Sequence, residues 1–292
     1  MPHNFHNKCL VCDTEKIIPL KGYEKYYLVK CENCGFVFTK LIPTQEELDE
    51  NYGSYERDDY LSPVTVKRYN EILEKFEKYR KTNRILDVGC GMGYFLEIAK
   101  DRGWEVYGTE YTDEAIEICK SKEIEVRKGK LTADLFDKES FDVITSFEVI
   151  EHINDPVDEI RISRELLRNG GIYYLTTPNF NSLLRYYLKG KYTYVLIIPD
   201  HLCYYTPKSL KYVLTKCGFK KKWIRTTGFS ISNLKQKNIT SASEIINPDS
   251  SDEKIRVSME RNVFMKIMKR SANSLLTLLG VGDTIKATFI KP

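Results

Sequence analysis

The chain has 292 residues, 42% of them hydrophobic and 29% charged, which is typical of a folded protein with a large domain and room for a small appendage. Its formal net charge of +4 is small for this length and argues against nucleic-acid binding driven by charge. Since residues 1–30 contain no apolar run and the run at 194–199 is too short to span a bilayer, a cytoplasmic protein without a transmembrane segment is expected.

Four of the eight cysteines stand in two C-x2-C pairs, Cys9 with Cys12 and, eighteen residues later, Cys31 with Cys34. Paired thiolates at this separation are typical of a structural zinc site, and four protein ligands leave no open position for catalysis. The residues between the pairs indicate short strands. Residues 1–42 are therefore predicted to form a zinc ribbon whose folding depends on the metal, with a redox or disulfide role as the alternative.

Residues 43–82 form a charged connector with helical signals. Thr44 and Glu47 match a capping box, and residues 64–81 carry an apolar stripe at helical spacing that predicts a helix packed on the next domain. The tyrosines that either pack in this connector or cover a cofactor as a lid are Tyr52, Tyr55 and Tyr60.

From residue 84 onward, short strands alternate with helices, including a helix over 158–171 and a strand from 172. This alternation predicts an α/β fold with a mostly parallel sheet, helices on both faces and ligands at the carboxyl ends of the strands. The first turn has glycines at 89, 91 and 93, but Tyr94 stands where a dinucleotide-binding turn has its third glycine. Glu110 nevertheless ends the second strand, where a carboxylate would bind ribose hydroxyls. A ribose-bearing cofactor without a pyrophosphate fits both observations.

The sequence LDVGCGMG, residues 86–93, resembles motif I of class I S-adenosylmethionine-dependent methyltransferases, and the resemblance is clear over 84–220. It implies a Rossmann-like, seven-stranded sheet over 83–292, in which 221–229 and 282–292 form the final antiparallel hairpin. It implies S-adenosyl-L-methionine as the cofactor. The residues that it places around this cofactor are Asp87, Gly89, Cys90, Gly91, Gly93, Glu110, Tyr111, Ser146, Phe147 and Glu148.

One position departs from the family pattern. Many relatives carry an acidic residue after the third strand that meets the adenine amino group, whereas this chain reads RKGKLTADLF. Either the backbone near Lys130 and Leu131 takes this role, or Asp134 reaches the adenine.

Two histidines are candidate catalytic bases, because a hydroxyl acceptor must lose a proton during methyl transfer. His152 follows the fourth strand and either acts on the proton or caps and packs the local turn. His201 lies after the fifth strand, in a tyrosine-rich segment over about 179–207 that is predicted to form a substrate cap. His201 is the first choice as base, and a loop hydrogen bond is its alternative role.

An insertion over about 230–280 contains a predicted amphipathic helix at 259–279. Its packing on the sheet or at a homodimer interface is favoured over contact with a membrane surface through the same helix. The residues on its apolar face are Val263, Phe264, Ile267, Met268, Leu275, Leu278 and Leu279.

The zinc module joined to this core resembles enzymes that methylate sugars and other small metabolites. Methyl transfer to a hydroxyl of a sugar or glycan building block, as in polysaccharide biosynthesis, is the first choice. The alternatives are C-methylation of a nucleotide-linked keto-sugar, quinone-type O-methylation, RNA methylation through the ribbon, and a non-enzymatic scaffold. RNA is disfavoured because the ribbon is not basic: the segment from Cys12 to Cys34 has four lysines against four acidic residues.

Overall fold

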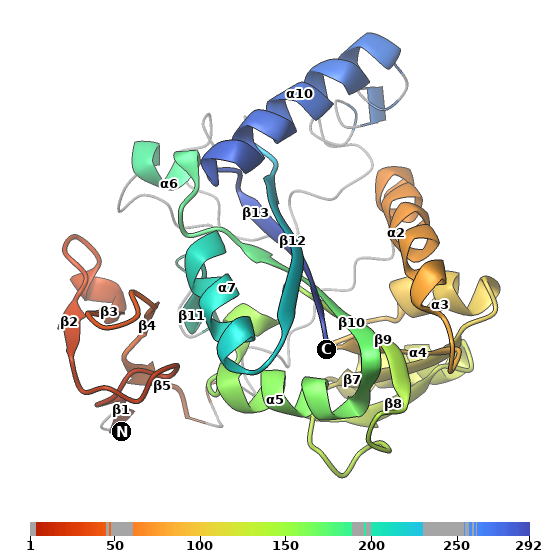
Figure 1. Ribbon diagram of the computed structural model, residues 1–292, viewed down its shortest axis with the longest axis horizontal. Coiled ribbons are helices and arrows are strands. Elements are labelled where there is room, and N and C mark those ends of the chain that lie inside the picture. The colour runs from red at the N-terminus through yellow and green to blue at the C-terminus, as the bar shows by residue number, and fades with distance from the viewer. Residues whose placement is uncertain are drawn as a thin grey trace.

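The computed structural model describes residues 4–44, 47, 61–188, 196, 200–229, 254, 257–258, 260 and 262–292. Its centre is a seven-stranded sheet in the order β12-β13-β10-β9-β6-β7-β8 (Figure 1). Six strands run in the same direction, and β13 alone of the seven runs antiparallel, between β10 and β12. The strand bounds are β6 Arg84–Val88, β7 Glu105–Glu110, β8 Glu125–Lys128, β9 Phe141–Phe147, β10 Leu167–Pro178, β12 Lys220–Thr227 and β13 Thr284–Ile290. The predicted fold class and the final hairpin are thereby confirmed.

Two apolar cores lie against this sheet. One contains buried residues of α2 (Pro63–Phe76) and α3 (Tyr94–Asp101), together with Cys119 of α4 (Asp113–Ser121). The other contains buried residues of α5 (Pro156–Leu166) and α7 (Pro207–Lys216). Side chains of a strand alternate between the two cores: Ile85 of β6 lies in the first, and Leu86 and Val88 lie in the second. This period of two is what a parallel strand covered on both faces requires.

Local signals place the helix starts where the sequence predicts them. The Ser62 hydroxyl accepts a hydrogen bond from the Val64 amide at the start of α2, which is followed by the 3-10 turn η2, Glu77–Tyr79. Thr206 and Ser209 form a capping box at α7, with Pro207 in its first turn. Thr44 and Glu47 also bond as a capping box, with 2.8 Å between the Thr44 amide nitrogen and Glu47 Oε2. Tyr52, Tyr55 and Tyr60 lie outside the described residues.

The predicted helix over 158–171 is too long. In the structure α5 ends at Leu166, and β10 begins at Leu167 with a register shift against β9 before Ile172. The cause is a tertiary contact: the Arg168 guanidinium pairs with the buried carboxylate of Asp142 on β9, which helical periodicity does not reveal.

The N-terminal module is built into the rest of the chain. Its sheet has the order β11-β4-β3-β2, and β11 comes from beyond the fifth strand of the central sheet. The bounds are β1 Asn4–Phe5, β2 Ile17–Pro19, η1 Glu24–Tyr26, β3 Leu28–Cys31, β4 Val37–Thr39, β5 Leu41–Ile42 and β11 Cys203–Tyr204. The rings of Phe36 and Tyr205 are 5.3 Å apart, and Phe36 belongs to the same core as α5 and α7. The boundary predicted at residue 42 therefore separates sequence segments that share a sheet and a core.

The helix α10, Val263–Leu279, lies at the top of the molecule in Figure 1. It contacts β12 through polar groups, including the Thr226 hydroxyl, which donates to the Leu276 carbonyl at 2.7 Å. All seven residues of the predicted apolar face are exposed, between 52% and 82%. The helix therefore contacts the sheet through its other face and not through this one, and the homodimer and membrane contacts stay predictions. No helix among the described residues is long and apolar enough to cross a membrane.

The predicted cap is described in part. It contains α6, Leu183–Leu188, and the segment from 200 to β11. Residues 189–195 and 197–199 lie outside the described residues, as does most of 230–261.

Candidate active site and four-cysteine cluster

The glycine turn joins β6 to α3 through three left-handed residues. The φ angles of Gly89, Gly91 and Gly93 are 65°, 52° and 72°. A Cβ atom at Gly89 would lie 2.7 Å from Val149 Cγ2, so the absence of a side chain also permits close packing there. The turn is thereby held against the segment that follows β9.

Two carboxylates stand beside this turn. Glu110, at the end of β7, accepts hydrogen bonds from the amides of Gly91 (2.9 Å), Tyr111 (2.7 Å) and Thr112 (3.1 Å). Asp87 of β6 is buried, and its carboxylate accepts the Thr145 hydroxyl at 2.7 Å. Burial raises the pKa of Asp87 to about 7, the Thr145 hydrogen bond opposes this rise, and the negative Glu110 adds to it. The site therefore holds a buried carboxylate that a cationic group would stabilise.

These residues fit the cofactor that the sequence predicts. Its ammonium group would supply the positive charge that Asp87 lacks, and the carboxylate of Glu110 has acceptor capacity for ribose hydroxyls beyond its amide bonds. Tyr111 is 47% exposed, so its ring is available to an adenine. The side chains of Cys90 and Leu131 are instead buried, so backbone groups are what these two residues can offer a ligand.

The carboxyl end of β9 brings Ser146, Phe147 and Glu148 beside the same turn. Ser146 is fully buried, and Phe147 packs edge-on against Phe95 of α3 at 4.9 Å between ring centroids. Glu148 has a left-handed φ of 54° and an exposed side chain. Desolvation by the surrounding protein nevertheless raises the pKa of Glu148.

The two candidate bases lie together. The rings of His152 and His201 are 4.8 Å apart and nearly perpendicular, and ligand atoms of both lie within 4.8 Å of Glu151. His152 belongs to the 3-10 turn η3, Ile150–His152, which directly follows the Val149 side chain against Gly89. This geometry brings both predicted bases toward the glycine turn from different segments.

The surroundings of His152 determine its charge state. Burial lowers the pKa of His152, but its hydrogen bond to Asp200 (Nδ1 to Oδ1, 2.9 Å) and the negative charges of Glu151 and Asp200 outweigh this and raise it to about 9. Burial, followed by the charge of Glu148, raises the pKa of Glu151 to about 8. His152 is therefore protonated at neutral pH and cannot accept a proton there.

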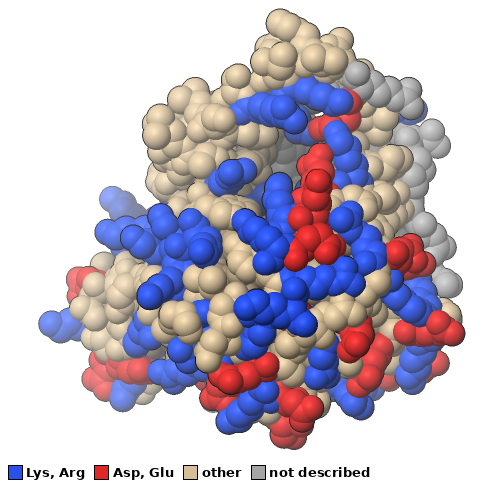
Figure 2. Space-filling view, turned by 45° about the vertical axis from the view of Figure 1, so that its right-hand side comes forward, with Lys and Arg blue, Asp and Glu red and all other residues tan. Residues whose placement is uncertain are grey.

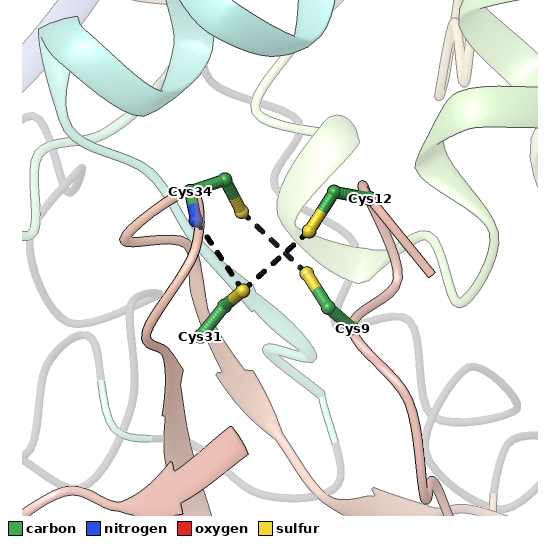
Figure 3. Close-up of side chains that lie close together, drawn as sticks. All are labelled: Cys9, Cys12, Cys31 and Cys34. Carbon is green, nitrogen blue, oxygen red and sulfur yellow. Dashed lines mark hydrogen bonds between the residues drawn. The ribbon is translucent and has the colours of Figure 1, made fainter. Parts of the chain in front are cut away.

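The four predicted zinc ligands converge (Figure 3). The sulfur atoms of Cys9 and Cys34 are 3.6 Å apart, and those of Cys12 and Cys31 are 3.5 Å apart. A tetrahedral zinc ion with Zn–S bonds of about 2.3 Å would space its ligands by about 3.8 Å. The Val11 and Cys34 amides point at sulfurs, with N–S distances of 3.5 and 3.4 Å. Donor type, number and spacing all fit zinc.

This cluster is tied to the segment that carries His201. Residues Cys203–Tyr204 pair with β4, and the Thr39 amide donates to the Leu202 carbonyl at 2.9 Å. On the other side, the Leu202 amide donates to the Glu151 carbonyl at 2.8 Å. A short path of backbone hydrogen bonds thus joins the cysteine module to the histidine cluster.

Comparison with known proteins identifies the family to which this chain belongs. Residues 60–222, more than half of the chain, match the family model described as "Methyltransferase domain". The chain belongs to this family. It contains a methyltransferase domain with the class I fold of S-adenosylmethionine-dependent methyltransferases, as the glycine turn predicts.

Two curated relatives of this methyltransferase are ubiquinone biosynthesis O-methyltransferases. The Pelagibacter ubique protein is 30% identical over 154 residues, which cover 48% of this chain and 63% of the relative. The Haemophilus ducreyi protein is 33% identical over 142 residues, covering 44% and 57%. The chain thus spans less than two thirds of the length of either relative.

Among solved structures, a SAM-dependent methyltransferase from Archaeoglobus fulgidus has a TM-score of 0.53 at 20% identity, covering 84% of this chain and 98% of its own. Phosphoethanolamine N-methyltransferase 2 from Haemonchus contortus also has a TM-score of 0.53, at 17% identity, covering 88% of this chain and 62% of its own. At these identities the likeness establishes the fold alone.

Sequence reasoning missed the polar partners of the histidines. Glu151 follows Glu148 by three residues in the sequence EVIEH, a spacing that could have drawn attention to it. Asp200 directly precedes His201, but its contact with His152 joins segments 48 residues apart, and no local pattern signals it.

Proposed function

We propose that this methyltransferase transfers a methyl group to a hydroxyl of a small-molecule acceptor. The observation that carries the proposal is that two groups lie close together. One is the buried carboxylate of Asp87 beside the glycine turn, and the other is the pair of His152 and His201 after β9. Bound S-adenosylmethionine supplies a methyl group already activated by its sulfonium. The chain therefore has to align the acceptor and remove its proton, and alignment can contribute roughly 7–11 kcal/mol.

In this proposal His201 is the general base. Burial lowers the pKa of His152, but its hydrogen bond to Asp200 and the nearby negative charge raise it to about 9, which leaves His201, from the predicted cap, as the preferred base. Asp87, Glu110 and the glycine turn hold the cofactor, and Phe147 and Glu148 border its methionine end. The predicted cap over about 179–207 closes the acceptor side.

The relatives favour a quinone-type aromatic hydroxyl as the acceptor. Two similar proteins carry the name ubiquinone biosynthesis O-methyltransferase, which supports this alternative over the sugar hydroxyl that the sequence analysis prefers. A sugar-type hydroxyl is the second candidate, because a cavity rich in Lys and Arg lies near the end of β9 and suits an acceptor that carries phosphate.

We also propose that Cys9, Cys12, Cys31 and Cys34 hold one structural zinc ion. Because they supply four thiolates and the module has little core of its own, the metal would stabilise the fold rather than bind the acceptor. Elemental analysis of freshly purified protein should give one zinc per chain, and a content well below one would contradict the assignment.

The function is tested with labelled S-adenosylmethionine. Transfer is measured to catechol-type phenols, to free and phosphorylated sugars, and to RNA, with Glu110→Ala as the inactive control. Transfer to a phenol or sugar hydroxyl is expected. Transfer to RNA alone, or to none of these acceptors by a protein that binds the cofactor, would overturn the proposal.

A further inference from the structure

A cavity of about 230 Å³ opens on the face of the central sheet that α2 covers. It lies between α2 with η2 on one side and the strands β10, β12 and β13 on the other. Figure 2 looks at this side of the molecule and shows Lys and Arg side chains around a hollow. The charged residues that line the cavity are Arg68, Lys75, Lys78, Arg225, Lys286 and Glu71.

The charge of this cavity is unbalanced. Five of its lining side chains are cationic and one is a carboxylate. That carboxylate, Glu71, lies 3.8 Å from Lys67, which is outside the lining. Glu148 attracts Arg68 and Lys286, but it offsets a single charge. Arg68 and Lys286 form no ion pair with another residue in the described part of the chain. The excess positive charge is available to an anion.

Two of these cations face each other directly across a strand pair. Arg225 of β12 and Lys286 of β13 are register partners in the antiparallel hairpin, and both line the cavity. Like charges in this arrangement destabilise a sheet. Lys286 is also half-buried: burial, followed by the charge of Arg68, lowers its pKa to about 8. A sheet edge selected for stability alone would not place two cations opposite each other in a partly desolvated site.

The uncharged lining includes four aromatic residues, and one of them, Tyr174, packs toward the predicted cofactor site. The Tyr174 ring lies 6.0 Å from that of Trp223 and 5.5 Å from that of Phe147, which ends β9 beside the glycine turn. A single ring therefore separates the cavity from the predicted methionine end of the cofactor. The buried Tyr174 ring would therefore lie between a ligand held by the cations and the methionine end of the cofactor.

We propose that this cavity is an oxyanion subsite for a small-molecule acceptor that carries a phosphate or diphosphate group, with Arg68, Arg225 and Lys286 as its principal ligands. Several cations around one small space suit a multivalent anion better than a single carboxylate, and guanidinium groups bind phosphate oxygens in pairs. That the ligand is the methyl acceptor rests on the proposed function. Binding of the anion itself can be measured without methyl transfer.

The test is calorimetric titration of inorganic pyrophosphate into the full chain, at low ionic strength because screening weakens such binding. Arg225→Gln and Lys286→Gln should each weaken binding by about tenfold or more, the low end for a lost charge-assisted bond. Lys211→Gln, which removes an exposed cation on α7, is the matched control and should bind as the wild type does.

Stability separates a binding role from a structural one. Since removing one of two opposed cations relieves repulsion, both variants should unfold at the same temperature as the wild type or higher, without pyrophosphate. Pyrophosphate should raise the wild-type midpoint and leave theirs nearly unchanged. No measurable isotherm for the wild type, or variant isotherms equal to it, would overturn the subsite.

Three further measurements distinguish a failure of the anion subsite from a failure of the proposed methyl transfer. Retained S-adenosylmethionine affinity in the variants, with loss of pyrophosphate binding, supports the subsite even if no acceptor hydroxyl is found. Methyl transfer to neutral catechol without any pyrophosphate isotherm would sustain the function and overturn the subsite. Binding of anionic phospholipid vesicles through Arg225 and Lys286, again without a pyrophosphate isotherm, would overturn it in favour of a lipid headgroup.

Discussion

The cofactor end and the acceptor end of the candidate site are assembled in different ways. At the cofactor end, the turn after β6, the end of β7 and the end of β9 each come from one short segment. Asp87, Glu110 and Phe147 lie in these three strands, which the sequence predicts. At the acceptor end, β11 joins the cysteine module, Asp200 holds His152, and β12 pairs with a strand 57 residues further on. Local motifs thus specify the cofactor site, whereas tertiary contacts specify the acceptor site.

Loss of zinc should have the largest effect on turnover, because the cysteine module supports the segment that carries His201. Chelation with 1,10-phenanthroline, or the substitution Cys34→Ser, is expected to abolish turnover, because structural zinc contributes on the order of 10 kcal/mol and β4 positions the segment before β11. Cofactor affinity should fall as well, because Cys9 and Cys31 share a core with Leu86 and Val88 of β6, which leads into the glycine turn. Turnover and cofactor calorimetry measure both.

The isomer 1,7-phenanthroline, which does not chelate, serves as the control and should have no effect. Full turnover in protein shown by elemental analysis to be free of zinc would contradict the structural role of the four cysteines.

Replacement of His201 should affect the chemical step. His201→Ala is expected to lower turnover at least about 100-fold, the low end of a general-base contribution, with cofactor affinity near the wild-type value. The ascending limb of the wild-type pH–rate profile should disappear in this variant. His6→Ala, which removes a half-buried histidine of the N-terminal module, is the matched control.

Wild-type turnover in His201→Ala on the true acceptor would show that another group takes the proton or that the acceptor is a carbon or an amine. His152→Ala is expected to disturb folding or cofactor binding as well, because its turn follows Val149, which packs on Gly89.

The histidine cluster should also make stability depend on pH, a smaller effect. The folded-state pKa of His152, about 9, lies above its ordinary value of about 6.5, so its stabilisation is complete below that value and is lost as pH rises through 9. Glu151, raised to about 8, acts in the same direction because folding retains its proton. Each group adds at most about 1.4 kcal/mol per pH unit to the slope.

Urea unfolding between pH 6.5 and 9 measures this slope, which should be shallower in His152→Asn than in the wild type. An equal slope in the two proteins would show that His152 does not hold an extra proton in the folded state.

These contrasts explain what sequence reasoning could and could not reach. The strand and helix order, the capping box at Thr44 and the four converging cysteines follow from short-range patterns. The end of α5 was misplaced because the Arg168–Asp142 pair overrides helical periodicity. The exposure of the α10 apolar face was misjudged because amphipathicity does not say what covers a face.

The cation pair of Arg225 and Lys286 was also out of reach. Each residue is an ordinary charged position in its own strand, and the register that opposes them depends on a hairpin whose two strands lie far apart in sequence. Its function as an anion site remains a proposal.

The most direct test of the account is calorimetric titration of S-adenosylmethionine into the wild type and Glu110→Ala, with Glu117→Ala, an exposed carboxylate on α4, as the matched control. One cofactor should bind per wild-type and control chain. Glu110→Ala should bind roughly 10- to 150-fold more weakly, corresponding to about 1.5–3 kcal/mol for one lost charge-assisted bond. Unchanged affinity in Glu110→Ala, or no isotherm for the wild type, would contradict the placement of the cofactor at the glycine turn.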